Sequence, residues 1–95
     1  MSASTDNPVR DNEAAHRFEL TENGLTAFAT YRRHDDTVVI PHVEAPPALR
    51  GKGTADRLMQ GIVQLAEAGN FKIAPRCPYA SAWAGRHPEV RHLFV

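Results

Sequence analysis

The chain has little cysteine, no excess of charge of either sign and no long apolar run. Its one cysteine, Cys77, has no second thiol to pair with, so a disulfide within the chain is excluded and we expect a reduced thiol. The 11 basic and 11 acidic residues give a formal net charge of zero, so we expect neither a nucleic-acid nor a membrane partner, because both select for basic excess.

Sequence features of membrane insertion and export are missing as well. No apolar stretch approaches the roughly 20 residues that a membrane helix needs. The N-terminus has no charged start followed by an apolar run, which a signal peptide requires. We therefore expect a cytoplasmic protein, either a monomer or a weak homodimer, since exposed strand edges in a small domain can pair.

The 95 residues suffice for one domain. Residues 1–14 are polar apart from one isolated valine, and we expect them to form a disordered tail before a domain over 15–95. "HRFEL" alternates in polarity, and Asn23-Gly24 is a strong signal for a type I′ hairpin turn. Three antiparallel strands are predicted within 16–45, with a bulge or an unpaired stretch at Pro41.

The apolar period changes after residue 53. Residues 54–68 carry a one-sided helical stripe that stops at Gly69-Asn70. A short strand over 71–74 follows, and then a second helix that begins at Pro78 and ends before Pro88. The predicted order is βββαβα, an α+β domain with two main helices on a mostly antiparallel sheet. The segment 37–74 can form one parallel crossover, and we expect Trp83 and Phe94 in the core.

The loop "LRGKGTADRL" places Gly51 and Gly53 beside Arg50 and Lys52, directly before the first helix. Glycine lets backbone approach a ligand closely, and a helix N-terminus attracts anions, so a phosphate site is physically sensible. The spacing fits neither the Walker loop nor the dinucleotide fingerprint. What remains is Arg50-x-x-Gly53-x-Ala55, and the alternative is a plain turn with solvated charges.

"RGKGTA" resembles the coenzyme A pyrophosphate loop of the GNAT acetyltransferase superfamily. The resemblance extends through "HVEAPPALRGKGTADRLMQ" and "APRCPYASAWAGRHPE" to about residues 16–94, and is closest to the small single-domain GNAT-like proteins. It implies acetyl-CoA as co-substrate, with a V-shaped slot where the strand before the loop splays from the next strand. The residues that it places against the cofactor are Val43, Glu44, Ala45, Arg50, Gly51, Lys52, Gly53, Thr54, Ala55 and Cys77.

Glu44 and His42 are the candidate general bases. They share one face of the predicted strand that enters the loop. Either group could accept the proton that an attacking amine loses, directly or through water. The alternative is that the two side chains only pair with each other or face solvent.

Cys77 and Tyr79 follow the strand that should flank the slot. Cys77 could accept the acyl group or only line the pocket, and the start of a helix at Pro78 would lower the pKa of its thiol. A buried structural cysteine is the ordinary alternative. Tyr79 is a candidate proton donor to the leaving thiolate, as tyrosines near this point are in many GNAT enzymes, or else a core residue.

No metal site is expected, because the five histidines show no close pair spacing and no acidic triad accompanies them. We expect an N-acetyltransferase that moves the acetyl group to a primary amine, such as an exposed lysine, a peptide terminus or a small amine. The chain lacks the extra N-terminal helices of larger relatives, so the acceptor site should be open. The alternatives are a non-catalytic module that binds coenzyme A or an acyl-CoA, and a plain interaction domain.

Overall fold

The computed structural model describes residues 7–95. Within these residues, a five-stranded sheet carries two α-helices and three short 3-10 helices. In chain order the elements are β1 (Arg10–Asn12), η2 (Glu13–Ala15), β2 (Arg17–Glu22), β3 (Leu25–His34), β4 (Thr37–Glu44), η3 (Pro47–Leu49), α1 (Thr54–Gly69), β5 (Lys72–Pro75), α2 (Pro78–Gly85) and η4 (Pro88–Leu93). Within the described residues, no helix is long and apolar enough to cross a membrane.

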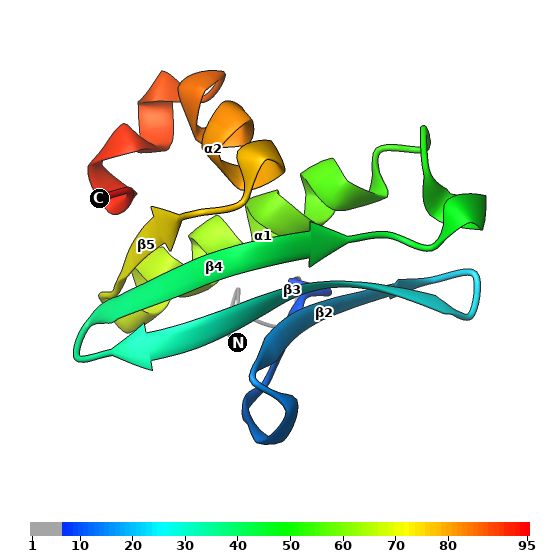
Figure 1. The fold of residues 1–95 in the computed structure, drawn as a ribbon, viewed down its shortest axis with the longest axis horizontal. Helices are drawn as coiled ribbons and strands as arrows, with labels where there is room; N and C mark the ends of the chain where they lie inside the picture. Colours follow the sequence, from blue (N-terminus) through cyan, green and yellow to red (C-terminus); the bar gives the residue numbers. More distant parts are fainter. Residues whose placement is uncertain (1–6) are drawn as a thin grey trace.

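The strands lie in the order β1-β2-β3-β4-β5. Strands β1 to β4 pair antiparallel with one another, whereas β4 and β5 are parallel and joined by α1. Figure 1 shows α1 running behind the sheet and α2 lying beyond β5. The predicted α+β class, with two main helices and one parallel crossover, is confirmed.

The hairpin between β2 and β3 turns at Asn23-Gly24. Both residues have positive φ, 53° and 75°, as a type I′ turn requires. Strand pairing continues to the turn itself, where Glu22 lies opposite Leu25. The hairpin predicted from the sequence is therefore present, and its turn leaves Glu22 at the tip.

The core lies between the sheet and α1. Phe18 and Leu20 on β2 are buried, and the apolar stripe of α1 covers them with Leu58 and Ile62. This arrangement follows from a period of two in the strand and 3.6 in the helix. Trp83 is also buried, as predicted, and Phe94 packs against the same core. The second helix ends at Gly85, earlier than expected, and a 3-10 helix follows.

The expectation of a disordered tail over residues 1–14 is wrong for residues 7–14, while residues 1–6 lie outside the described part. Residues 10–12 form β1 at the edge of the sheet. Val9 is 4% exposed and packs into the core cluster. It fits because Gly61 of α1 has no Cβ, and Asn7 Nδ2 donates to the Gly61 carbonyl at 3.0 Å. Residues 7–14 are thus ordered by one buried valine and an available strand edge, although their composition suggested disorder.

Candidate active site

Strands β4 and β5 part in the middle of β4. Their parallel pairing ends where Ile40 lies opposite Pro75. The Ile40 carbonyl accepts hydrogen bonds from the N–H groups of Arg76, at 2.9 Å, and Cys77, at 3.1 Å. Beyond this point β4 continues to Glu44 while still paired with β3, so its other edge is left open within the described residues.

The parting coincides with an irregularity at Pro41. The register between β3 and β4 shifts by one residue in this region, and proline supplies no N–H to a ladder. The bulge or unpaired stretch expected at Pro41 is therefore present.

The loop that follows β4 delivers backbone N–H groups to the start of α1. Gly51 and Gly53 have φ of 76° and 80°, a region that favours glycine. Gly53 is the N-cap of α1 and no side chain caps this end. Within residues 7–95, five backbone N–H groups of the loop and first helical turn have no hydrogen-bond partner: those of Gly51, Gly53, Thr54, Ala55 and Asp56.

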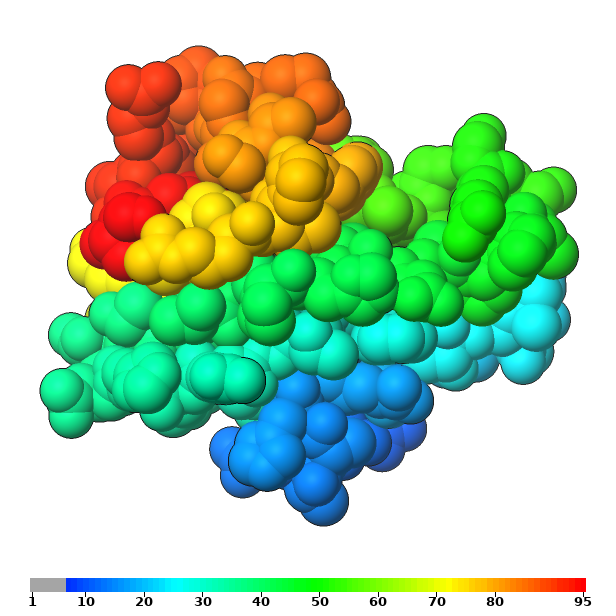
Figure 2. Space-filling view, in the orientation of Figure 1, coloured from blue at the N-terminus to red at the C-terminus, as the bar shows by residue number. Residues whose placement is uncertain are grey.

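A cavity of about 240 Å³ lies in front of these groups. In Figure 2 the surface is hollowed between the loop before α1 and the region of α2. Loop and helix both contribute to the lining, which consists of Ala45, Leu49, Arg50, Gly51, Gly53, Thr54, Ala55, Asp56 and Tyr79. Most of the residues that the resemblance placed against the cofactor thus surround one cavity, and Tyr79 faces it from α2.

The cavity is positively polarised by its surroundings. The free N–H groups are the positive end of the α1 macrodipole. Arg50 is exposed, and its Nε donates to the carbonyl of Ala45, another residue of the lining, at 3.1 Å. The carboxylate of Asp56 opposes this field but is engaged on both oxygens, by Trp83 Nε1 at 2.7 Å and Gln60 Nε2 at 2.8 Å.

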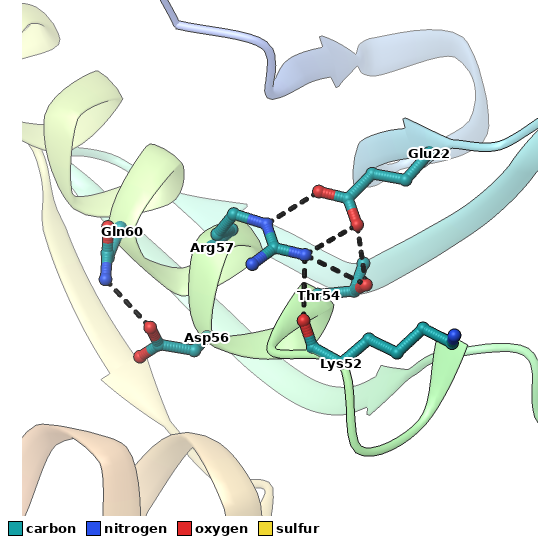
Figure 3. Close-up of polar contacts among 6 residues, drawn as sticks. All are labelled: Glu22, Lys52, Thr54, Asp56, Arg57 and Gln60. Carbon is teal, nitrogen blue, oxygen red and sulfur yellow. Dashed lines mark hydrogen bonds and ion pairs between the residues drawn. The ribbon is translucent and has the colours of Figure 1, made fainter.

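Behind the loop, a cluster of polar side chains fixes its path (Figure 3). The carboxylate of Glu22, at the tip of the β2–β3 hairpin, accepts hydrogen bonds from Thr54 Oγ1 at 2.7 Å and from Arg57 Nε and Nη2 at 2.7 and 2.8 Å. Arg57 Nη2 also donates to the Lys52 carbonyl at 3.0 Å. Hydrogen bonds from Arg57 and Thr54 lower the pKa of Glu22 to about 2.

This cluster was not predicted from the sequence. Thr54 follows Glu22 by 32 positions and Arg57 follows it by 35, and no local spacing connects residues so far apart. Leu49 and Asp56 were also missed as cavity residues, although both flank the glycine loop.

Lys52, Val43 and Cys77 are not among the residues that line the cavity. The Lys52 side chain is exposed and, in Figure 3, extends away from Glu22 and Arg57. Val43 is half-buried against the core. Cys77 is 6% exposed, is a free thiol and is the N-cap of α2, with Pro78 as the first helical residue.

The candidate bases His42 and Glu44 are brought together by the structure. His42 Nε2 and Glu44 Oε1 are 2.8 Å apart, and the side chains are 55% and 49% exposed. Neither residue lines the cavity, but Glu44 ends β4 directly before Ala45, which does. The burial of Tyr79, and secondarily the charge of Asp56, raises the pKa of its phenol, so the group is protonated at neutral pH.

The remaining histidines do not assemble a metal site. Among residues 7–95, no group of three or more His, Cys, Asp or Glu side chains is arranged to hold a metal ion. His87 stacks on Trp83 with ring centroids 3.7 Å apart, and its Nδ1 lies 2.8 Å from the Trp83 carbonyl. This histidine is thus engaged in packing at the end of α2.

Comparison with known proteins defines the class. Residues 17–93 match the family model described as GCN5-related N-acetyl-transferase. The match spans most of the chain, which therefore belongs to this family of acetyl-transferring enzymes. The family generally uses acetyl-CoA. A comparison with curated proteins gives no match.

The fold is shared with a solved structure. The NMR solution structure of a GCN5-like protein from Staphylococcus aureus, named as a candidate N-acetyltransferase, superposes with a TM-score of 0.70. The two are 24% identical, and the alignment covers 94% of this chain and 89% of that one. At this identity the similarity concerns the fold, which confirms the GNAT-like architecture expected from "RGKGTA" and its flanking segments.

Proposed function

We propose that the protein transfers an acetyl group from acetyl-CoA to an exposed primary amine. The loop and the first turn of α1 are the proposed pyrophosphate site. The observation that carries this proposal is the set of five backbone N–H groups that have no partner among residues 7–95, on residues that line a cavity at a helix N-terminus. Such groups bind anions well, because the macrodipole adds to their hydrogen-bonding capacity.

The glycines support the same assignment. A Cβ at Gly53 would lie 3.0 Å from Arg57 Nη1, and any other residue would be strained at a φ of 80°. Arg50 and Lys52, both exposed, add positive charge at the entrance. The backbone of residues 50–55 is thus suited to a diphosphate, with Arg50 and Lys52 as its side-chain partners.

The open edge of β4 is the proposed site of the pantetheine arm. The arm contains amides, and within the described residues Val43 and Glu44 have no partner strand on the β5 side, beyond the last β4–β5 contact at Ile40. Cys77, whose N–H is bonded to that same Ile40 carbonyl, lies beside the point where the strands part. Val43, Glu44, Ala45 and Cys77 would therefore flank the arm and its thioester.

The acetyl transfer requires a base and an acid. The acceptor ammonium gives one proton to the His42–Glu44 pair, and the neutral amine attacks the thioester carbonyl. The carbon–sulfur bond breaks, and the leaving thiolate takes a proton from Tyr79, whose phenol is protonated at neutral pH. The acylated nitrogen then gives up its second proton as the amide forms, and this proton restores the Tyr79 phenol. The partial exposure of His42 and Glu44 suits an acceptor that arrives from solvent, such as a lysine side chain, a peptide terminus or a small amine.

Cys77 offers a second route. Its thiol loses a proton and attacks the thioester, coenzyme A leaves and takes up that proton, and the neutral amine then displaces the Cys77 thiolate from the acyl-enzyme. An acetylated form of the protein, trapped in the absence of amine and detected by intact mass, distinguishes this route from direct transfer. The Cys77→Ala variant would lose both the trapped species and turnover on that route, and would keep turnover if Cys77 only lines the slot.

A second candidate function is a module that binds coenzyme A or an acyl-CoA without transfer. One observation favours it: His42 and Glu44 bond to each other and do not line the described cavity. Turnover with a panel of primary amines separates the two functions, since a binding module would retain cofactor affinity without turnover.

The testing experiment is a titration of the protein with acetyl-CoA, free coenzyme A and ATP, followed by amide chemical shifts and calorimetry. Selective binding of the two coenzymes, with shifts in residues 50–56 and around Cys77, is the expected result. Equal and weak binding of all three polyphosphates would overturn the proposal, and the loop would then be a turn with solvated charges.

A further inference from the structure

We infer that Glu22 is a positioning residue for the cofactor loop: from the tip of the β2–β3 hairpin, its carboxylate holds the loop in the shape that leaves the anion-binding N–H groups free. This inference rests on the proposed function and deepens it. Glu22 does not line the cavity, so it acts through Thr54 and Arg57.

The contacts join three separate parts of the chain. Glu22 ends β2, Thr54 begins α1, and Arg57 lies one turn further along that helix. Three hydrogen bonds of 2.7 to 2.8 Å converge on the one carboxylate. A carboxylate whose two oxygens accept from two nitrogens of one guanidinium forms a strong and directional pair, so the hairpin tip and the first turn of α1 are rigidly connected.

Arg57 transmits this connection to the loop backbone. Its Nη2 donates to the Lys52 carbonyl. In a trans peptide unit the C=O and the following N–H point in opposite directions. Holding the Lys52 carbonyl toward Arg57 therefore turns the N–H of Gly53 away from Arg57, and Gly53 is a residue that lines the cavity.

Glu22 also occupies two groups that could otherwise interfere with anion binding. A threonine hydroxyl in the first helical turn can bond to the free N–H groups of its own helix. The buried Thr54 side chain instead has its Oγ1 held at Glu22, to which it donates at 2.7 Å, and this oxygen lies 3.5 Å from Arg57 Nη2, which donates to it. The guanidinium of Arg57 is fixed behind the loop, so the N–H groups in front keep an unobstructed approach.

The test compares Glu22→Gln with Glu19→Gln. Both glutamates lie on β2 and both pair with an arginine, but Glu19 pairs with Arg17 and makes no contact with the loop. We expect Glu22→Gln to bind acetyl-CoA and free coenzyme A about tenfold more weakly, which corresponds to the weakening of one charged hydrogen bond. Glu19→Gln should bind both as the unaltered protein does.

S-Acetyl-pantetheine, which lacks the pyrophosphate, separates a local effect on the loop from a general structural defect. A general defect would weaken the use of this donor too, whereas a change confined to the pyrophosphate site would not. The KM of S-acetyl-pantetheine as acetyl donor should be unchanged in Glu22→Gln. If Glu22→Gln does not fold, Arg57→Lys provides the second variant. It keeps the charge but removes the fork that reaches both Glu22 and the Lys52 carbonyl, and we expect the same selective loss.

Several outcomes would overturn the inference. Unchanged affinity for acetyl-CoA in Glu22→Gln would show that the cluster does not shape the loop. Tighter binding would show that Glu22 restrains Arg57 from acting as a direct ligand. An equal loss for S-acetyl-pantetheine would indicate general destabilisation. If the unaltered protein does not bind acetyl-CoA, the proposed function fails, and the inference fails with it.

Discussion

The indole Nε1 of Trp83 donates a hydrogen bond of 2.7 Å to the carboxylate of Asp56. Trp83 is a buried residue of α2, whereas Asp56 lies in the first turn of α1 and lines the cavity. The bond therefore joins the helix that carries Tyr79 to the helix that begins at the glycine loop. It also keeps a negative charge close to a site proposed for a dianion.

This charge should oppose cofactor binding while it supports the helix. We expect Asp56→Asn to bind acetyl-CoA several-fold more tightly at low salt, with the difference shrinking as salt screens the charge. The same change should destabilise the fold by about 0.5 kcal/mol, since it removes a favourable charge from a helix N-terminus. Calorimetry at two salt concentrations and urea unfolding provide the two measurements. An affinity that does not change at low salt would contradict this prediction.

Gly53→Ala should lower the free energy of unfolding by more than the strain of its backbone conformation alone. The new Cβ would be strained at positive φ, by about 1–2 kcal/mol, and would also crowd Arg57 Nη1 at 3.0 Å. Gly24→Ala is the matched control, because its φ is 75° and nothing lies within 4 Å of its Cβ. Urea unfolding should show the larger loss for Gly53→Ala, together with weaker acetyl-CoA binding. Equal losses would show that Arg57 moves away freely.

The docked N-terminal segment can be tested at Gly61. A Cβ there would overlap Val9 Cγ2 at 2.1 Å, so Gly61→Ala should destabilise the fold by about 1–3 kcal/mol through overpacking. Val9→Ala should partly rescue Gly61→Ala, since it removes the overlapping methyl groups. The two single variants, the double variant and the unaltered protein form a double-mutant cycle, measured by urea unfolding. Additive effects would show that residues 7–9 do not pack on α1 in solution.

Glu22 makes the stability of the fold decrease at acidic pH. Its folded pKa, about 2, lies below the ordinary value of 4.5. Its contribution to stability is therefore fully present above about pH 4.5 and is lost as the pH falls toward 2. We expect Glu22→Gln to reduce the fall in urea midpoint across this window. Glu19, whose pKa is also lowered by its hydrogen bond with Arg17, keeps part of the dependence in the variant.

Removal of the Tyr79 hydroxyl tests the proposed acid. We expect Tyr79→Phe to lower kcat by about 100-fold, within the usual range for general acid catalysis, with little effect on acetyl-CoA affinity. Tyr31→Phe is the control, because that hydroxyl is bonded to Asp11 at the far edge of the sheet. An unchanged kcat in Tyr79→Phe would show that Tyr79 does not protonate the leaving thiolate.

The parts of the fold with a strong local pattern were predictable from the sequence. The stripe of α1 and the Asn23-Gly24 turn depend on residues close together in the chain, and the structure contains both. The break at Pro41 follows from its missing N–H and is also present. The glycine loop was identified through its resemblance to a coenzyme A loop, and Arg50, Gly51, Gly53, Thr54 and Ala55 line one cavity.

Features that depend on distant residues were not predictable. The ordering of residues 7–14 depends on Val9 meeting Gly61, and the loop cluster depends on Glu22 meeting Thr54 and Arg57. Each pair is more than thirty positions apart, and the sequence contains no local signal for either. The pairing of His42 with Glu44 was one of two alternatives that strand periodicity allowed, and the structure shows the pair.

The shared acceptor at Ile40 links the width of the proposed pantetheine slot to the positions of Cys77 and Tyr79. The carbonyl of Ile40 binds the N–H groups of Arg76 and Cys77, directly before the helix that carries Tyr79. Any movement that widens the gap between β4 and α2 therefore displaces the thiol and the phenol together. Room for a bulkier acyl group and alignment of these two side chains cannot be altered separately, so a substitution at this junction should change acyl selectivity and rate at once.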